Sequence, residues 1–240
     1  MCRQFRIKKI IALLCALIVW TSGFPLTVSA AELGNANSQV IVSLGDSYSS
    51  GEGIEPFFGQ DLPISLKVKN YSWLAHRSEN AWSGMLSLPS LSGTMSENAD
   101  NWYFVAASGA TTANIDGIFE KTYYKKQPSK FLPNLQDTVP LPPQISIFEN
   151  LKEEGKAADY VTITIGGNDV DFTGTVIAAV CSSTFLTPAY LSDKINNTWE
   201  DFYEGGIRES ICSTYEKIHK AAGEDARIIV AGYPKLLDPG

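Results

Sequence analysis

Three residues of the chain have the chemical character that serine-based nucleophilic catalysis requires. Ser47 stands in the triplet Gly45-Asp46-Ser47, Gly109 lies in a short polar segment, and Asn168 follows two glycines. A serine nucleophile needs hydrogen-bond donors for the oxyanion that develops on a substrate. Ser47 is the candidate nucleophile, and the Gly109 N–H and the Asn168 carboxamide are candidate donors. Taken singly, Gly109 also fits an ordinary turn glycine and Asn168 an ordinary helix cap.

Each of these residues follows an apolar, β-prone run, and a fourth such run comes later in the sequence. Short continuous apolar runs are typical of buried parallel strands. The carboxyl ends of such strands meet at one edge of an open α/β sheet, where ligands bind. The order of the candidates after successive strands therefore favours a shared site. We expect the strands at residues 40–44, 102–107, 160–165 and 226–231, the last leading into Gly232-Tyr233-Pro234.

The segments between these runs divide into helical and irregular stretches. Apolar residues recur at helical spacing in the longest stretch, which ends at Gly223, a natural helix stop. We expect helices at 80–86, 144–152, 176–180 and 207–222, and surface loops at 52–72 and 122–143. Strands separated in this way predict a parallel sheet with helices on both faces, joined by right-handed crossovers.

Residues 1–30 have the pattern of a secretory signal peptide, with four basic residues, an apolar run and small residues at a cleavage site. The apolar run is too short to span a bilayer comfortably, so we expect a secreted protein without stable membrane insertion. Removal of the four basic residues changes the net charge from −7 to −11. This acidity argues against nucleic acid and anionic lipid headgroups as partners. Residues 31–240 suffice for a single domain.

Two cysteines, Cys181 and Cys212, lie outside the signal peptide. Secreted proteins experience an oxidising environment, so we expect these two residues to form a disulfide bond. A metal site would need further cysteines or histidines at recognisable spacing, and the sequence has none.

Three ordered segments, Gly45-Asp46-Ser47, Gly109 and Gly166-Gly167-Asn168-Asp169, resemble the first three sequence blocks of the SGNH hydrolases, the GDSL esterases and lipases. The wider segments 45–53, 107–112 and 232–234 are similar to the secreted bacterial lipase-like branch.

This resemblance implies an α/β fold, a three-layer α/β/α sandwich with a flavodoxin-like parallel sheet. It further implies that Ser47 is the nucleophile and that the oxyanion hole is formed by the Ser47 N–H, the Gly109 N–H and the Asn168 side chain, while Asp46 braces the turn. The implied protein is a secreted, monomeric ester hydrolase without a cofactor or metal. Its substrates would be lipid, carbohydrate or other small-molecule esters.

Two parts of the family pattern are absent. A Cys-x-Arg-Ser segment, which carries a disulfide in this branch, is replaced by a segment containing His76-Arg77-Ser78, and the final Asp-x-x-His block is not found. His219 is interpreted as a surface residue of a helix, and His76 as a loop or packing residue rather than a base. We therefore expect the last strand and the catalytic histidine beyond Gly240, and poor activity from the 240 residues alone.

Two other functions compete with the ester hydrolase. The first is a catalytically inactive relative of the same fold that binds acyl or glycan groups. The second is a flavodoxin-like nucleotide-binding protein, which the sequence disfavours because it lacks a glycine-rich loop that would cradle a phosphate.

Overall fold

The computed structural model describes residues 39–88, 91–124, 136–172, 174–175 and 188–233. The chain divides into two compact units, residues 1–34 and 35–240, and every described residue belongs to the second. The signal peptide predicted at residues 1–30, the helix predicted at 176–180 and Cys181 all lie outside the described residues. The single domain predicted for 31–240, the disulfide and the signal peptide therefore stay predictions.

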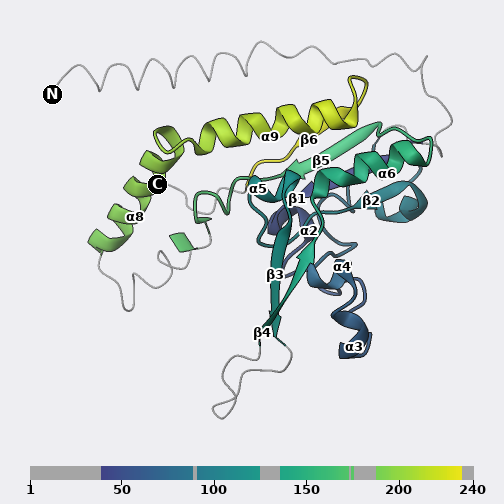
Figure 1. Cartoon of the computed structure of the whole chain (residues 1–240), viewed down its shortest axis with the longest axis horizontal. Helices are drawn as coiled ribbons and strands as arrows, with labels where there is room; N and C mark the ends of the chain where they lie inside the picture. The colour runs from purple at the N-terminus through teal and green to yellow at the C-terminus, as the bar shows by residue number, and fades with distance from the viewer. Residues whose placement is uncertain (1–38, 89–90, 125–135, 173, 176–187, 234–240) are drawn as a thin grey trace. The chain divides into compact units, whose positions relative to one another are not determined.

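A four-stranded parallel sheet forms the centre of the described unit (Figure 1). Its strands are β1 (Ile41–Gly45), β2 (Trp102–Phe104), β5 (Tyr160–Thr164) and β6 (Arg227–Val230), in the order β2-β1-β5-β6. All four coincide with predicted strands, and the predicted parallel α/β sheet is confirmed. The chain places β2 on one side of β1 and β5 on the other. The carboxyl ends of β1 and β5 therefore flank the switch point at which open α/β sheets bind ligands.

The main hydrophobic core lies on one face of this sheet. Val42 and Leu44 point from β1 toward helices α6 (Ile147–Glu153) and α9 (Ile207–Ala222). Phe148 and Leu151 of α6 and Ile218 of α9 are buried in the same cluster. Helix α9 ends at Gly223, as its sequence predicts, with the glycine N–H bonded to the His219 carbonyl oxygen. Figure 1 shows α6 and α9 lying along the sheet.

The other face of the sheet is covered mainly by short helices and turns. Ile41 packs there against Met95 and Trp102, and the Trp102 indole donates to the Ser43 hydroxyl at 2.7 Å. Helix 80–86 is a wrong prediction, because these residues form turns. Gly84 lies close to the chain before it in these turns, since a Cβ there would lie 2.2 Å from the Glu79 carbonyl oxygen. The regular elements near this face are α2 (Ser47–Ser50) and η2 (Ser96–Asn101).

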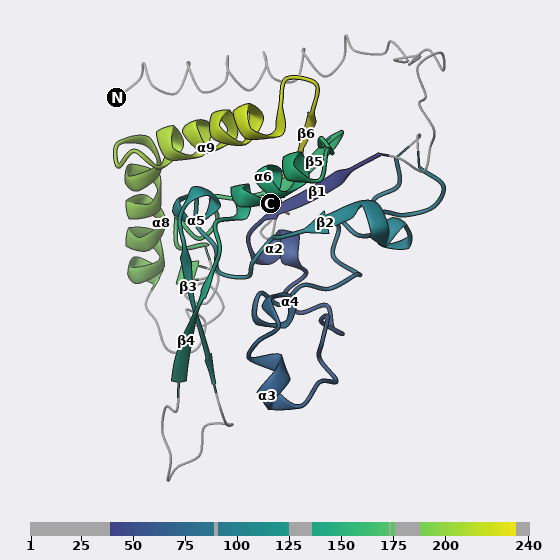
Figure 2. The ribbon, with the colours of Figure 1, turned by 45° about the vertical axis from the view of Figure 1, so that its right-hand side comes forward.

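Two stretches predicted as loops contain regular structure. Segment 52–72 includes the one-turn helices α3 (Ile64–Lys67) and α4 (Tyr71–Leu74), which are too short to show a hydrophobic period. Within 122–143, the described residues belong largely to an antiparallel hairpin of β3 (Phe119–Tyr124) and β4 (Gln136–Leu141). Figure 2 shows these two strands side by side, leading away from α5. The prediction of a wandering surface loop is therefore wrong for the described part.

The hairpin is stabilised by apolar side chains on one face of its two strands, which pack against a hydrophobic cluster. Phe119 and Tyr123 of β3 and Val139 and Leu141 of β4 pack against a cluster that includes Leu74. The remaining elements are α5 (Ala113–Asp116), η3 (Gln144–Ser146) and α8 (Pro188–Tyr203), of which α8 has no counterpart in the predictions. Within the described ranges, no helix combines the length and the apolar character needed to cross a membrane.

Candidate active site

The turn that carries Ser47 is built around a glycine that no other residue can replace. Gly45 ends β1 with a φ of +124°, and a Cβ there would lie 2.3 Å from the Thr164 carbonyl oxygen and 2.6 Å from the Ser49 hydroxyl oxygen. Asp46 then caps helix α2, since its carboxylate accepts the Tyr48 N–H at 3.0 Å. Ser47 is the first residue of α2 and is half-buried.

The Ser47 hydroxyl makes no hydrogen bond to any other residue in the described part of the chain. Its backbone N–H belongs to the first turn of a helix, where N–H groups have no intrahelical acceptor. Both groups are therefore free to meet a ligand at the carboxyl edge of the sheet.

Gln144 holds the end of β1 from the side. Its Oε1 accepts the Gly45 N–H at 2.7 Å, and its Nε2 donates to the Gly45 carbonyl oxygen at 2.8 Å. The side chain is 5% exposed, so both bonds form away from water. The sequence analysis did not identify this residue, because an isolated glutamine at the start of a helix carries no signal for a contact 99 residues away.

The loop after β2 brings Gly109 to the same edge. The Ala107 N–H donates to the Gly45 carbonyl oxygen at 2.9 Å, which joins this loop to the Ser47 turn. Gly109 is exposed and has a φ of +89°, a conformation that favours glycine. Arg77 fixes the approach to the loop, because its guanidinium donates to the carbonyl oxygens of Ala106 at 2.7 Å and Val105 at 3.1 Å. Burial lowers the pKa of Arg77 to about 10.

The loop after β5 is bonded directly to the loop after β2. The Asn168 Nδ2 donates to the Ala110 carbonyl oxygen at 2.7 Å, and the Asp169 carboxylate accepts the Thr112 N–H at 3.0 Å and the Thr112 hydroxyl at 2.5 Å. A carboxamide nitrogen has two donor hydrogens, so Asn168 keeps one for a ligand. Hydrogen bonds thus join the Gly109 loop to the Asn168 loop, and the Asn168 carboxamide makes one of them.

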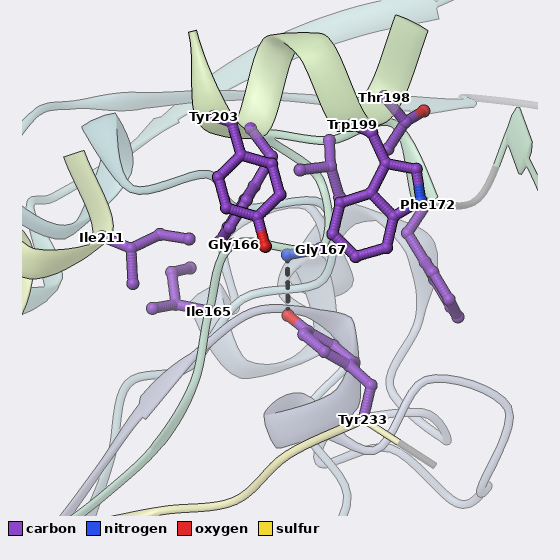
Figure 3. A pocket seen from close by; sticks show the side chains of 11 residues that line it. Ile165, Gly166, Gly167, Phe172, Thr198, Trp199, Tyr203, Ile211 and Tyr233 are labelled. Carbon is purple, nitrogen blue, oxygen red and sulfur yellow. Dashed lines mark hydrogen bonds between the residues drawn. The ribbon is translucent and has the colours of Figure 1, made fainter. Parts of the chain in front are cut away.

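Tyr233 connects the Ser47 turn to the Asn168 loop from a third direction. Its hydroxyl donates to the Asp46 carboxylate and accepts the Gly167 N–H at 2.9 Å, the bond that Figure 3 marks. The Tyr233 ring stacks on Phe172, with 5.6 Å between ring centroids. Asp46 is only 1% exposed, and burial raises its pKa above the ordinary value. Burial, together with the neighbouring Asp46, also raises the pKa of Tyr233.

The two histidines are not bonded to Ser47 within the described residues. His76 Nδ1 lies 2.7 Å from Glu52 Oε2, and the His76 ring stacks on Phe57 with 4.8 Å between centroids. This hydrogen bond is the main reason why the pKa of Glu52 is lowered. These contacts agree with the packing role predicted for His76. His219 is exposed on α9, which confirms its interpretation as a surface helix residue.

An apolar pocket of about 440 Å³ opens beside the Asn168 loop (Figure 3). Gly166 and Gly167 form one wall, Trp199 and Tyr203 of α8 form another, and Tyr233 belongs to both the pocket and the bridge to Asp46. The other lining residues are Ile165, Val170, Phe172, Thr198, Phe202 and Ile211. The pocket therefore presents apolar surface next to a candidate oxyanion donor.

The chain is similar to two lipases of Streptomyces. Lipase 1 of Streptomyces coelicolor is 23% identical over 234 residues, which cover 93% of this chain and 66% of that protein. The crystal structure of an extracellular lipase from Streptomyces rimosus superposes with a TM-score of 0.51 at 21% identity, covering 85% of this chain and 63% of that one. This chain has the fold of that lipase. No family model matches the chain.

The weak homology and the shared fold are consistent with the SGNH hydrolase resemblance seen in the sequence. The chain spans about two thirds of the length of Lipase 1 and 63% of the length of the extracellular lipase. The placement of Ser47, Gly109 and Asn168 after β1, β2 and β5 follows the order predicted from the sequence. Asp169 and Tyr233 join these loops to one another, while Gln144 holds the end of β1 and Arg77 holds the segment after β2. The sequence analysis assigned a role to none of these four residues.

Proposed function

We propose that the protein is a secreted serine ester hydrolase of lipase or esterase type. The observation that carries this proposal is that hydrogen bonds join the three loops bearing Ser47, Gly109 and Asn168 at the switch point of the sheet. The lipases with which the chain shares weak homology and fold support the same reaction class.

In the proposed reaction, the Ser47 hydroxyl oxygen attacks the ester carbonyl carbon and the carbonyl oxygen becomes an oxyanion. The Ser47 N–H, the Gly109 N–H and the free Asn168 N–H stabilise that oxyanion. The alcohol then leaves, and water hydrolyses the acyl-enzyme to release the carboxylic acid. We place the base that takes the Ser47 proton outside these 240 residues, because neither His76 nor His219 is hydrogen-bonded to Ser47 among the described residues and the SGNH resemblance implies a histidine from a later sequence block.

The apolar pocket supports an ester with an apolar acyl group. Its lining is dominated by aromatic and aliphatic side chains, and it borders Gly167, the residue before Asn168. Such surroundings favour an alkyl chain over a sugar, which needs several polar partners. We therefore rank lipid-like esters above carbohydrate acetates as substrates. Residues 1–30 would direct secretion of the mature protein.

The proposal is tested by labelling the complete secreted gene product with a fluorophosphonate, which reacts with activated serines. Wild type should be labelled at Ser47, and Ser47→Ala should not be labelled. Ser213→Ala, which removes an exposed serine of α9, is the control and should be labelled like wild type. Undiminished labelling of Ser47→Ala would contradict the assignment of the nucleophile. A folded wild type that binds acyl ligands without being labelled would favour the inactive binding relative.

A further inference from the structure

Tyr233 occupies an unusual place with respect to the two halves of the proposed site. It follows β6, which pairs with β5 and not with β1 in the order β2-β1-β5-β6. Its hydroxyl nevertheless reaches the Asp46 carboxylate after β1 and the Gly167 N–H after β5. One oxygen atom is thus bonded to the residue before Ser47 and to the residue before Asn168.

The bonds of Asp46 show why this oxygen matters for Ser47. One carboxylate oxygen of Asp46 accepts the Tyr48 N–H at 3.0 Å and a long bond of 3.4 Å from the Thr164 hydroxyl. The other carboxylate oxygen accepts the Tyr233 hydroxyl. Because Asp46 is almost fully buried, loss of this donor would leave a charged oxygen without compensation, which the fold can relieve only by moving the side chain or protonating it. Either response changes the hydrogen bonds that hold Asp46, the residue next to Ser47.

We propose that Tyr233 is a positioning residue, which sets the Ser47 nucleophile relative to the Asn168 oxyanion donor through the bridge Asp46–Tyr233–Gly167. This inference rests on the proposed ester hydrolase function. The ring of Tyr233 is itself held, stacked on Phe172 and 5.8 Å between centroids from the Tyr48 ring, so the hydroxyl has a defined position. A displacement of about 1 Å at such a site costs on the order of a hundredfold in rate.

A simple structural role for Tyr233 makes a different prediction from a positioning role. The Phe172 stacking and the pocket wall need only the aromatic ring, which Tyr233→Phe retains. The bridge needs the hydroxyl, which Tyr233→Phe removes. Tyr215→Phe is the matched control, because Tyr215 is a half-buried tyrosine of α9 whose pKa is also raised by burial and by the charge of Asp46, and whose hydroxyl takes no part in the bridge.

The test compares hydrolysis of p-nitrophenyl butyrate by the complete secreted wild type, Tyr233→Phe and Tyr215→Phe. Rates are measured at a temperature at which circular dichroism shows all three to be folded. We expect kcat of Tyr233→Phe to fall about tenfold to a hundredfold with KM within about twofold of wild type. Tyr215→Phe should keep the wild-type values. Wild-type kcat in Tyr233→Phe, or an equal loss in Tyr215→Phe, would overturn the proposal.

A pH profile and a double variant show whether Tyr233 acts through Asp46. The Tyr233 hydrogen bond lowers the pKa of Asp46 against the raising effect of burial, so its loss should move the acid limb of kcat to higher pH. Among the described residues, Tyr215 and Tyr233 are the titratable groups whose pKa values are raised by burial and by Asp46, and both stay neutral at acidic pH. The rate loss of Asp46→Asn combined with Tyr233→Phe should be clearly smaller than the product of the two single losses. If the rate losses of the two single variants multiply in the double variant, or if the acid limb of the kcat profile does not move in Tyr233→Phe, Tyr233 does not act through Asp46.

These measurements also distinguish failure of the Tyr233 proposal from failure of the proposed ester hydrolase function. Wild type without ester turnover would contradict the ester hydrolase itself. In that case a carbon NMR titration of Asp46 still tests the bridge, and a higher Asp46 pKa in Tyr233→Phe than in wild type would support it. Equal Asp46 pKa values in the two proteins would overturn it.

Discussion

Replacement of Asn168 by alanine separates the proposed catalytic contribution of its carboxamide from its structural contribution. Among the described residues, the Asn168 side chain makes one hydrogen bond, to the Ala110 carbonyl oxygen at 2.7 Å. Loss of a neutral hydrogen bond of this kind costs about 0.5 to 1.5 kcal/mol in the free energy of unfolding. Loss of one oxyanion donor raises the reaction barrier by about 2.7 to 4 kcal/mol, which lowers kcat by about a hundredfold to a thousandfold. The expected effect on turnover is thus clearly larger than the effect on stability.

The assay measures kcat for a p-nitrophenyl ester and the thermal midpoint of the complete secreted protein. The control is Asn98→Ala in η2, because the Asn98 Nδ2 also donates to backbone carbonyl oxygens, that of Thr94 at 2.7 Å and that of Ser92 at 3.2 Å. Both variants should lose a few degrees in Tm, since about 1 kcal/mol corresponds to about 2 to 4 °C at this size. Only Asn168→Ala should lose turnover. Equal turnover in the two variants would refute the oxyanion role and leave Asn168 as a tie between loops.

Two further predictions concern covalent structure and acid stability. Mass spectrometry of the non-reduced secreted protein should show a disulfide-linked peptide that contains Cys181 and Cys212. In the chain-entropy model, a disulfide of this span raises the free energy of unfolding by about 3 to 4 kcal/mol. Detection of two free thiols would contradict the prediction. The hydrogen bond with His76 depresses the pKa of Glu52 below its unfolded value of 4.5, so the stability from this pair is present above pH 4.5 and is lost as the pH falls through the folded pKa. Thermal midpoints between pH 7 and pH 3 should therefore fall more steeply for wild type than for Glu52→Gln, and parallel curves would show that the pair does not contribute.

The central sheet was predictable because its strands are signalled locally. The runs at β1, β2, β5 and β6 are rich in apolar residues and lead into glycine-containing turns, a pattern typical of the strands of a parallel sheet. Helix α9 carries a clear helical period and a glycine stop. By contrast, the one-turn helices α3 and α4 are shorter than any readable period, and the strand pairing of the β3–β4 hairpin depends on an apolar cluster supplied by distant residues.

The site was predictable only in part, for a related reason. Ser47, Gly109 and Asn168 stand two to five residues after the ends of strands, so their place at one sheet edge follows from topology. By contrast, three other side chains contact segments that are distant in the sequence. Gln144 contacts a residue 99 positions away, and Arg77 contacts residues 28 and 29 positions away. Tyr233 contacts residues 66 and 187 positions away. Their residue types are compatible with many other roles, and their function emerges only when the fold brings the partners together.

The most direct test of this account is to trap the acyl-enzyme of the complete secreted protein with a slowly hydrolysed p-nitrophenyl ester and to locate the acyl group by peptide mass spectrometry. The account predicts a single acyl group on Ser47 that forms as p-nitrophenol is released and then disappears as the acid is released. Ester turnover with the acyl group on another residue, or with no acylated residue, would contradict it.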